Sequence, residues 1–401
     1  MITACNIGNP QQLKQKPITF FRQVAALVEY PDLLKESSLG KFPTLFPADA
    51  IARATEVIAA VGGSVGAYTT SQGIPLVRQR VAEFIQERDG YPANPDDIYL
   101  TAGASPGVQA VLNTVIADEN TGIMIPTPQY PLYSASIAMS GGKAVPYYLN
   151  ESADWDMSTQ ELERALSEAR ASGISVKALC VINPGNPTGQ CLSEESMKSA
   201  VEFCSREKLV LLADEVYQSN IYQMDRPFIS FKKVLKSMSA DYENFELISF
   251  HSVSKGMIGE CGRRGGYFEC VGIDKDIKGL LYKVASVSLC PPVAGQLMVE
   301  NMVNPPKPGS PSYELYKKEY DEIFGISNLN LESLKRRAQK LAKAFNSLQG
   351  VTCNEAQGAM YLFPQISLNT KVSTAAKAAN MKSDEFYAMA LLEATGVVKA
   401  I

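Results

Sequence analysis

The stretch SFHSVSKGMIGECGRRGGYF, which runs from Ser249 to Phe268, is the most informative part of the chain. It places Lys255 shortly after two small hydroxyl residues, Ser252 and Ser254, and nine positions before Arg264. A lysine whose pKa is lowered can form a Schiff base with an aldehyde and then act as a general base. Hydroxyls and an arginine suit a phosphate dianion, because a guanidinium offers a fork of donors. An aldehyde and a phosphate on one molecule suggest pyridoxal phosphate (PLP); the alternative is a surface lysine in a glycine-rich loop.

The chain around this stretch alternates between short apolar runs and amphipathic helices. We predict strands at residues 97–101, 122–126, 145–149, 178–182, 209–214 and 245–250, and helices at 77–88, 108–117, 132–139, 159–171 and 194–207. Apolar strands that alternate with helices are typical of a parallel sheet buried on both faces. The sequence therefore predicts an α/β fold, with a three-layer large domain and a mostly parallel sheet over residues 45–300.

The C-terminal part has a different pattern, which begins with the proline-rich run NPPKPGSPS at residues 304–312. It predicts helices at 313–324 and 331–348, a strand at 360–366 and a helix at 383–394. We interpret residues 301–401 as a smaller α+β domain that is incomplete here. Residues 1–44 are expected to contribute to that domain and to the edge of the active site.

Composition excludes several functional classes. The net charge is −4 and the sequence has no basic stripe, so nucleic-acid binding is not expected. His251 is the one histidine, and none of the eight cysteines forms a C-x-x-C pair, which excludes a multi-histidine metal site and a zinc ribbon. No run of 18 apolar residues predicts a membrane span.

Two glycine- and proline-rich turns follow predicted strands, where ligands bind in an open α/β sheet. Residues 103–107 open a helix, and the bare amides of Ala104 and Ser105 with the Ser105 hydroxyl would make an anion site. The turn at 183–189 (NPGNPTG) offers the Asn186 amide to a ring oxygen or a substrate carboxylate, and we predict a cis bond between Asn186 and Pro187. The alternative for both is a structural turn.

Three further residues follow the ends of predicted strands. Asp214 comes directly after an apolar strand, so its carboxylate needs a partner such as a pyridinium nitrogen, although a helix N-cap is an alternative role. Tyr217 could donate to a phenolic oxygen of the same ring. Tyr130, in a rigid proline-rich loop, could stack face-on against a flat ring or simply pack on the surface.

These motifs resemble those of class I (fold-type I) PLP-dependent aminotransferases, most closely the alanine aminotransferase group. The resemblance rests on NIGNP (6–10), AYTTSQG (67–73), PQYPLYS (128–134), INPGNPTGQ (182–190), LADEVYQ (212–218), SKGMIGECGRRGGY (254–267) and QGAMY (357–361). It covers nearly the whole chain, and the segment that contains Lys255 is its most specific part.

The resemblance implies roles for the residues named above. Lys255 carries PLP as an internal aldimine and moves the proton at the substrate Cα, and Asp214 pairs with the pyridine nitrogen. Tyr217 and Asn186 contact the ring oxygen, and Tyr130 stacks on the ring. The residues implied in phosphate binding are Ala104, Ser105, Ser252 and Arg264, with Ser254 close by.

The resemblance also implies a homodimer in which Tyr68 reaches the phosphate in the neighbouring subunit. Gly8 and Asn186 would lie beside the substrate carboxylate. The implied reaction converts L-alanine and 2-oxoglutarate into pyruvate and L-glutamate. The partners are therefore small amino acids and 2-oxo acids.

The chain departs from the family pattern at both ends. Family members carry residues before the NIGNP segment and, beyond the counterpart of residues 396–398, a strand whose arginine clamps the substrate carboxylate; here the sequence reads KAI. The alternative is thus a truncated PLP-binding homologue with weak or no transfer activity. The N-terminus lacks a signal-peptide pattern, so we expect a cytoplasmic protein, or a mitochondrial matrix protein if a targeting segment precedes it.

Overall fold

A seven-stranded sheet forms the centre of the protein. The computed structural model describes residues 2–5, 8–42, 45–222, 227–239, 242–256, 258–324 and 331–398. The sheet has the order β2-β8-β7-β6-β5-β3-β4. Its strands are β2 (Ile98–Thr101), β3 (Thr121–Thr127), β4 (Lys143–Tyr148), β5 (Ser175–Ile182), β6 (Val210–Asp214), β7 (Leu247–Ser252) and β8 (Gly266–Val271). All neighbours pair in parallel except β8, which is antiparallel to both β7 and β2.

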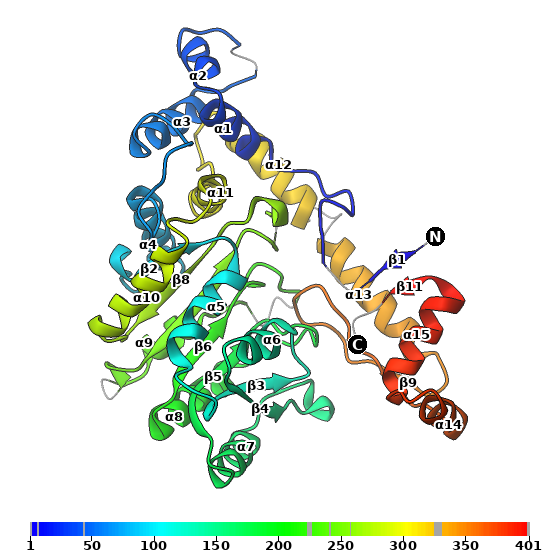
Figure 1. The fold of residues 1–401 in the computed structure, drawn as a ribbon. Helices are drawn as coiled ribbons and strands as arrows, with labels where there is room; N and C mark the ends of the chain where they lie inside the picture. The colour runs from blue at the N-terminus through cyan, green and yellow to red at the C-terminus, as the bar shows by residue number, and fades with distance from the viewer. Residues whose placement is uncertain are drawn as a thin grey trace.

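Helices cover both faces of this sheet, which gives the predicted three layers (Figure 1). One face packs against α5 (Ala104–Val115), α6 (Leu132–Met139) and α10 (Lys275–Val287). The other face packs against α4 (Pro75–Asp89), α7 (Thr159–Ala171), α8 (Glu194–Glu207), α9 (Phe231–Ser237) and α11 (Val293–Val303). Because both faces are buried, the central strands read as continuous apolar runs.

The remaining elements lie around this three-layer unit. Helices α1 (Thr19–Glu29), α2 (Pro31–Ser38) and α3 (Ala48–Ala60) pack against one another, and α1 also contacts α11 and α12 (Tyr313–Phe324). The C-terminal part adds α13 (Leu331–Asn346), α14 (Thr370–Ala378), α15 (Ser383–Thr395) and the antiparallel pair β9 (Val351–Thr352) and β10 (Gln365–Ile366). The two ends of the described chain lie side by side, because β1 (Thr3–Ala4) pairs in parallel with β11 (Val397–Val398) (Figure 1).

Local signals in the sequence account for the helix limits. Ser158 and Ser193 accept hydrogen bonds from backbone amides in the first turns of α7 and α8, which are standard N-cap contacts. Gly90 and Gly396 end α4 and α15 in the left-handed conformation that glycine adopts without strain. These caps explain why several helices begin and end where the sequence predicts them.

The predicted fold class is confirmed, and so are the limits of the helices at 132–139, 159–171, 194–207 and 313–324. The strand predicted at 360–366 is wrong except for β10; the residues just before it, 357–359, dock by backbone hydrogen bonds against residues 189 and 220–222. The helix predicted from 108 begins four residues earlier, at Ala104. Strand β8 and helices α1–α3, α9–α11 and α14 were not predicted.

Some predictions are not tested by this structure. The domain boundaries near residues 44 and 300 remain predictions. A few residues of the quoted motifs and of the C-terminal departure from the family lie outside the described residues: Asn6, Ile7, Met257 and residues 399–401. Among the described residues, no helix is long and apolar enough to cross a membrane.

Candidate active site

The predicted site residues gather at one edge of the sheet. The carboxyl ends of β2, β3, β5, β6 and β7 lie at this edge, and β8 starts there because it runs in the opposite direction. The loops after these ends carry Tyr130, Asn186, Tyr217, Ser254 and Lys255, and Ala104 and Ser105 begin helix α5 after β2. Asp214 and Ser252 are the last residues of β6 and β7, and Arg264 precedes β8. The topology therefore explains how residues far apart in sequence meet.

Lys255 lies against the N-terminal segment of the chain. Its Nζ donates a hydrogen bond to the Gly8 carbonyl oxygen. A Cβ on Gly8 would stand 3.3 Å from this Nζ and 3.1 Å from the Tyr361 hydroxyl, so there is little room for a side chain at position 8. The next residue, Gly256, donates its amide to Asn220 Oδ1 at 3.0 Å, which fixes the loop that carries Lys255.

Asp214 is a buried carboxylate, 7% exposed, at the end of β6. Its Oδ2 accepts a hydrogen bond from the Tyr133 hydroxyl at 2.8 Å, and its Oδ1 accepts one from the Val216 amide at 3.3 Å. Burial raises the pKa of Asp214 above its usual range, and the two hydrogen bonds offset this only in part. A cationic ligand group would stabilise the ionised carboxylate here.

Tyr217 and Tyr361 form a pair of phenols beside Lys255. Their hydroxyl oxygens are 3.0 Å apart and their rings meet edge to face, with centroids separated by 5.9 Å. Burial raises the pKa of Tyr217 well above its ordinary value, and Tyr361 and Asp214 raise it further. Tyr217 is therefore a neutral hydrogen-bond donor. Burial also raises the pKa of Tyr130, with contributions from Tyr361 and Asp214, which places Tyr130 at the same site.

A cup of donors lies at the start of α5. The N-cap residue, Gly103, has φ 95° and no side chain to cap the helix, so the amides of Ala104 and Ser105 are available to an anion. A Cβ on Gly103 would stand 2.4 Å from Arg264 Nη2, so only glycine allows the guanidinium to approach this closely. Arg264 Nη1 is 3.5 Å from Ser254 Oγ.

Ser252 completes this cup from the end of β7. It is 2% exposed, and its Oγ accepts the Ser254 amide at 3.3 Å. The cup thus combines helix amides, hydroxyls and one arginine, a donor set that suits a phosphate group.

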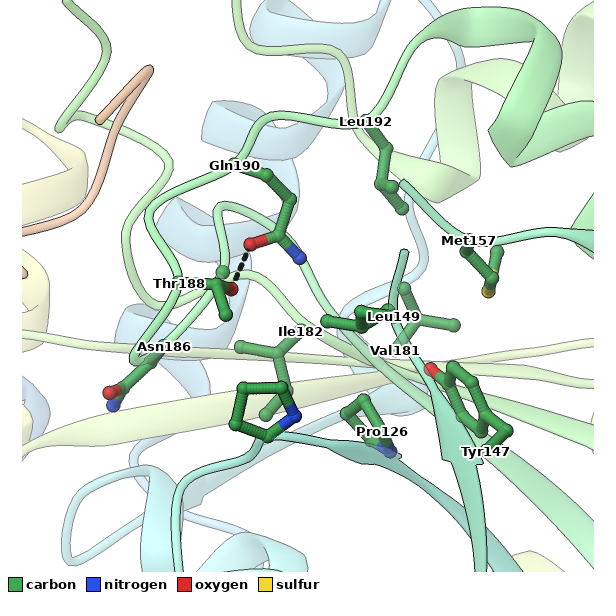
Figure 2. Close-up of a pocket in the computed structure, with 12 residues that line it drawn as sticks. Pro126, Tyr147, Leu149, Met157, Val181, Ile182, Asn186, Thr188, Gln190 and Leu192 are labelled. Carbon is green, nitrogen blue, oxygen red and sulfur yellow. Dashed lines mark hydrogen bonds between the residues drawn. The ribbon is translucent and has the colours of Figure 1, made fainter. Parts of the chain in front are cut away.

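Asn186 lies in the turn after β5, where the predicted cis bond to Pro187 is confirmed. Figure 2 shows its side chain pointing away from Gln190, whose Oε1 accepts a hydrogen bond from the Thr188 hydroxyl; all three residues line a small pocket. A Cβ on Gly185 would overlap the end of the Gln190 side chain, so a larger residue there would displace Gln190. The pocket is lined mainly by apolar residues such as Tyr147. None of its lining residues belongs to the loop that carries Lys255.

Tyr68 is the one predicted site residue that stands apart. Its side chain is 78% exposed, and among the described residues no hydrogen bond joins it to the other site residues. The structure also adds three residues that sequence analysis did not assign: Tyr133, Asn220 and Tyr361. Tyr133 and Tyr361 lie inside quoted motifs, and Asn220 is six residues after Asp214, so position in the motifs was the available signal.

Comparisons with known proteins identify the family. The sequence profile "Aminotransferase class I and II" matches residues 38–399. The chain belongs to this aminotransferase family. Over 397 residues it is 52% identical to a probable mitochondrial alanine aminotransferase from Dictyostelium discoideum; the alignment covers 99% of this chain and 72% of the relative. Two further relatives with 52% identity are alanine aminotransferase 2 from Panicum miliaceum and glutamate–glyoxylate aminotransferase 1 from Arabidopsis thaliana, each matched over 80% of its length.

Solved structures show the same fold. An alanine aminotransferase from Pyrococcus furiosus aligns with a TM-score of 0.74 and 20% identity over 99% of this chain and 82% of the other. This aminotransferase is therefore an enzyme that uses PLP, as class I members do. The residues at the sheet edge fit that cofactor: the cup at Gly103 accommodates a phosphate, and buried Asp214 suits a protonated ring nitrogen.

Proposed function

We propose that this enzyme transfers the amino group of L-alanine to 2-oxoglutarate, giving pyruvate and L-glutamate. The observation that carries the proposal is the convergence of Lys255, Asp214 and Tyr217 beside the Gly103 cup, in a chain 52% identical to named alanine aminotransferases. The transfer would occur in two half-reactions, with the amino group held on the cofactor between them.

The residues of the site divide the work between binding and proton transfer. Ala104, Ser105, Ser252, Ser254 and Arg264 would hold the phosphate. PLP, when bound, supplies an aldehyde that accepts the amino group and an electron-withdrawing ring that stabilises negative charge. Asp214 would pair with the ring nitrogen. The Lys255 amine would carry the cofactor between turnovers and move the proton at the substrate Cα.

The other residues would orient the ring and the substrate. Tyr217 would donate to the ring oxygen with Asn186, and Tyr130 would lie against the ring face. The Gly8 peptide would lie beside the substrate carboxylate, because it already contacts Lys255 Nζ. A bound molecule held from several sides reacts faster, because its orientation is fixed before the chemical step.

An absorbance measurement on the purified protein with PLP tests this proposal. The visible band of the lysine-bound cofactor should form, convert to the aminated form on addition of L-alanine with release of pyruvate, and return on addition of 2-oxoglutarate. Lys255→Ala should abolish the conversion. A band that L-alanine leaves unchanged would favour the alternative of a PLP-binding homologue without effective transfer.

A second oxo acid merits the same test, because a relative of equal identity is named glutamate–glyoxylate aminotransferase. We propose 2-oxoglutarate as the preferred acceptor and glyoxylate as the competitor. Stopped-flow rates for the aminated enzyme with each acceptor at equal concentration decide between them. A kcat/KM for glyoxylate at least tenfold higher would reverse this assignment.

We further propose that the enzyme is a homodimer in which Tyr68 completes the partner's phosphate site. The exposed Tyr68 supports this, as do exposed apolar side chains on α10: Ile277, Leu280, Tyr282 and Val287. Mixing Lys255→Ala and Tyr68→Ala subunits tests it, because a mixed dimer contains one intact site. Random exchange should restore about a quarter of wild-type activity from two weakly active parents; no recovery would contradict the proposal.

We propose the cytoplasm as the compartment, with the mitochondrial matrix as the alternative. The cysteines occur as scattered singles without a C-x-x-C pair, which fits a reducing compartment, and some relatives are named mitochondrial. Fractionation of the source cells, followed by immunodetection of the protein, distinguishes the two.

A further inference from the structure

Three distant segments of the chain meet at the hydroxyl of Tyr361. The Gly8 amide donates to it across 3.4 Å, a long hydrogen bond. The Tyr217 hydroxyl lies 3.0 Å from it. The Gly8 carbonyl oxygen, which belongs to the next peptide group, accepts from Lys255 Nζ. The Tyr361 hydroxyl therefore links the N-terminal segment, the loop after β6 and, through Gly8, the loop that carries Lys255.

Tyr361 is held at this point by a docked loop rather than by a strand. The amides of Gln357 and Gly358 both donate to the Gly189 carbonyl at 2.8 Å, and the Ala359 amide donates to the Asn220 carbonyl at 2.9 Å. A Cβ on Gly358 would stand 2.7 Å from that carbonyl oxygen, so the loop packs without spare room. Asn220 also receives the Gly256 amide, so the docked loop and the Lys255 loop share one anchor.

The number of available protons determines the direction of the hydrogen bond between the two phenols. Each hydroxyl has one proton, so when Tyr217 gives its proton to an acceptor in the site, Tyr361 must be the donor of the 3.0 Å bond. A phenol that accepts a hydrogen bond becomes a better donor, because hydrogen bonds in a chain polarise one another. The ionisable groups that act on Tyr217 are Tyr361, Asp214 and Tyr130.

We propose that Tyr361 is a positioning residue of the transamination site, whose hydroxyl holds Gly8 against Lys255 and directs the Tyr217 proton into the site. This inference rests on the proposed function. It assigns to the QGAMY loop a task that the packing of the loop alone does not require, because the docking bonds use backbone atoms of residues 357–359 and the Gln357 side chain, and leave the Tyr361 hydroxyl for the site.

The test compares Tyr361→Phe with Tyr222→Phe in the PLP-loaded enzyme. Tyr222 is a matched control, because its buried hydroxyl donates to the Ala359 carbonyl in the same docked loop and does not touch the site. An absorbance titration gives the pKa of the lysine-bound cofactor, and steady-state kinetics with L-alanine gives KM and kcat separately.

Tyr361→Phe should raise the pKa of the bound cofactor by about 0.5–1 unit, because Tyr217 becomes a weaker donor. It should also raise KM for L-alanine about 5–20-fold, the loss expected for one or two hydrogen bonds, with a smaller change in kcat. Tyr222→Phe should change the pKa of the bound cofactor and the KM for L-alanine by less than half of these amounts.

Two results would overturn the inference. In one, Tyr361→Phe keeps both the wild-type cofactor pKa and the wild-type KM. In the other, Tyr222→Phe reproduces the changes, which would make the effect one of loop packing. A wild-type protein that forms no PLP band would contradict the proposed function itself, and this inference with it, so the two failures are told apart by the wild-type spectrum.

Discussion

Asp214 and Glu215 are neighbours in sequence, yet they lie on opposite faces of the sheet and in different surroundings. Asp214 faces α6, where its partners are a phenol and an amide. Glu215 faces α4 and α9, where its Oε1 accepts the Phe231 amide at 2.7 Å. It belongs to a buried ionic cluster, which we define as Arg88, Asp89, Glu215, Lys232 and Glu269.

The two regions handle buried charge in different ways. In the buried ionic cluster, Arg88 pairs with Asp89 at 2.6 Å and Lys232 pairs with Glu269 at 2.6 Å. Burial raises the pKa of Glu215 to about 8, so at neutral pH a protonated Glu215 leaves two cations facing two anions. The cluster is balanced by the protein itself, whereas Asp214 has only neutral partners. A buried acid without a charged partner is therefore the better indicator of a ligand site.

The largest expected effect separates the two acids by activity. Asp214→Asn should lower kcat/KM about 10²–10⁴-fold, because an amide cannot pair with a protonated ring nitrogen and the loss of a buried charge pair is worth several kcal/mol. Glu215→Gln should keep kcat/KM within about threefold at pH 7, because the native group is already neutral there. Equal losses in both variants would show that the distinction between the regions is wrong.

The next effect concerns stability in the buried ionic cluster. Lys232→Met leaves Glu269 buried without its cation and should lower the free energy of unfolding by about 3–5 kcal/mol. The double variant Lys232→Met/Glu269→Met removes both charges and should recover most of that loss. Denaturant titrations of the three proteins measure it. A double variant as unstable as Lys232→Met would mean that packing, not the unpaired charge, causes the loss.

A smaller effect is expected at the phosphate cup. Gly103→Ala introduces a Cβ 2.4 Å from Arg264 Nη2 at a residue with φ 95°, and should weaken PLP binding about 10–100-fold. Gly141→Ala is the matched control, because Gly141 has φ 77° and no atom within 4 Å of the added Cβ. Fluorescence titration with PLP gives both dissociation constants. If the control weakens PLP binding equally, the clash with Arg264 is not the cause.

The sequence predicted the strand ends that carry the candidate site residues better than it predicted the elements around them. Lys255, Asp214 and Tyr217 stand next to strand ends, so the alternation of apolar strands and turns was enough to bring them together. The reversed strand β8 was missed because its sequence, GYFECV, contains an acid at Glu269 that suggests an exposed strand. Only the structure shows that Lys232, far away in sequence, neutralises that acid.

The position of Tyr361 could not be predicted for a similar reason. The run from 360 to 366 reads as a strand by composition, but only Gln365 and Ile366 form one, and Tyr361 follows a loop whose residues 357–359 bond to residues 189 and 220. Long-range docking of this kind leaves no periodic pattern in the sequence. The motif QGAMY marked the loop as informative, but its partners became visible only in three dimensions.

The smallest expected effect is a pH dependence of the free energy of unfolding that arises from Glu215 in the buried ionic cluster. Glu215 has a pKa of about 8 in the folded protein and an ordinary value of 4.5 when unfolded. Between these values the folded state holds a proton that the unfolded state has released, so stability falls as the pH rises towards 8. His251, whose pKa burial lowers to about 3, has the opposite sign, and its contribution ends near its ordinary value of 6.5.

The window from pH 6.5 to 8 therefore isolates Glu215 from His251. In that window the wild-type protein should lose more unfolding free energy with rising pH than Glu215→Gln, by up to about 1.4 kcal/mol per pH unit. Subtracting the two curves cancels the other buried acids, including Asp214. Glu163→Gln, at an exposed glutamate paired with Arg206, should keep the wild-type slope. Parallel curves for wild type and Glu215→Gln would mean that Glu215 is ionised at neutral pH, and the charge balance that distinguishes this cluster from the site around Asp214 would have to be abandoned.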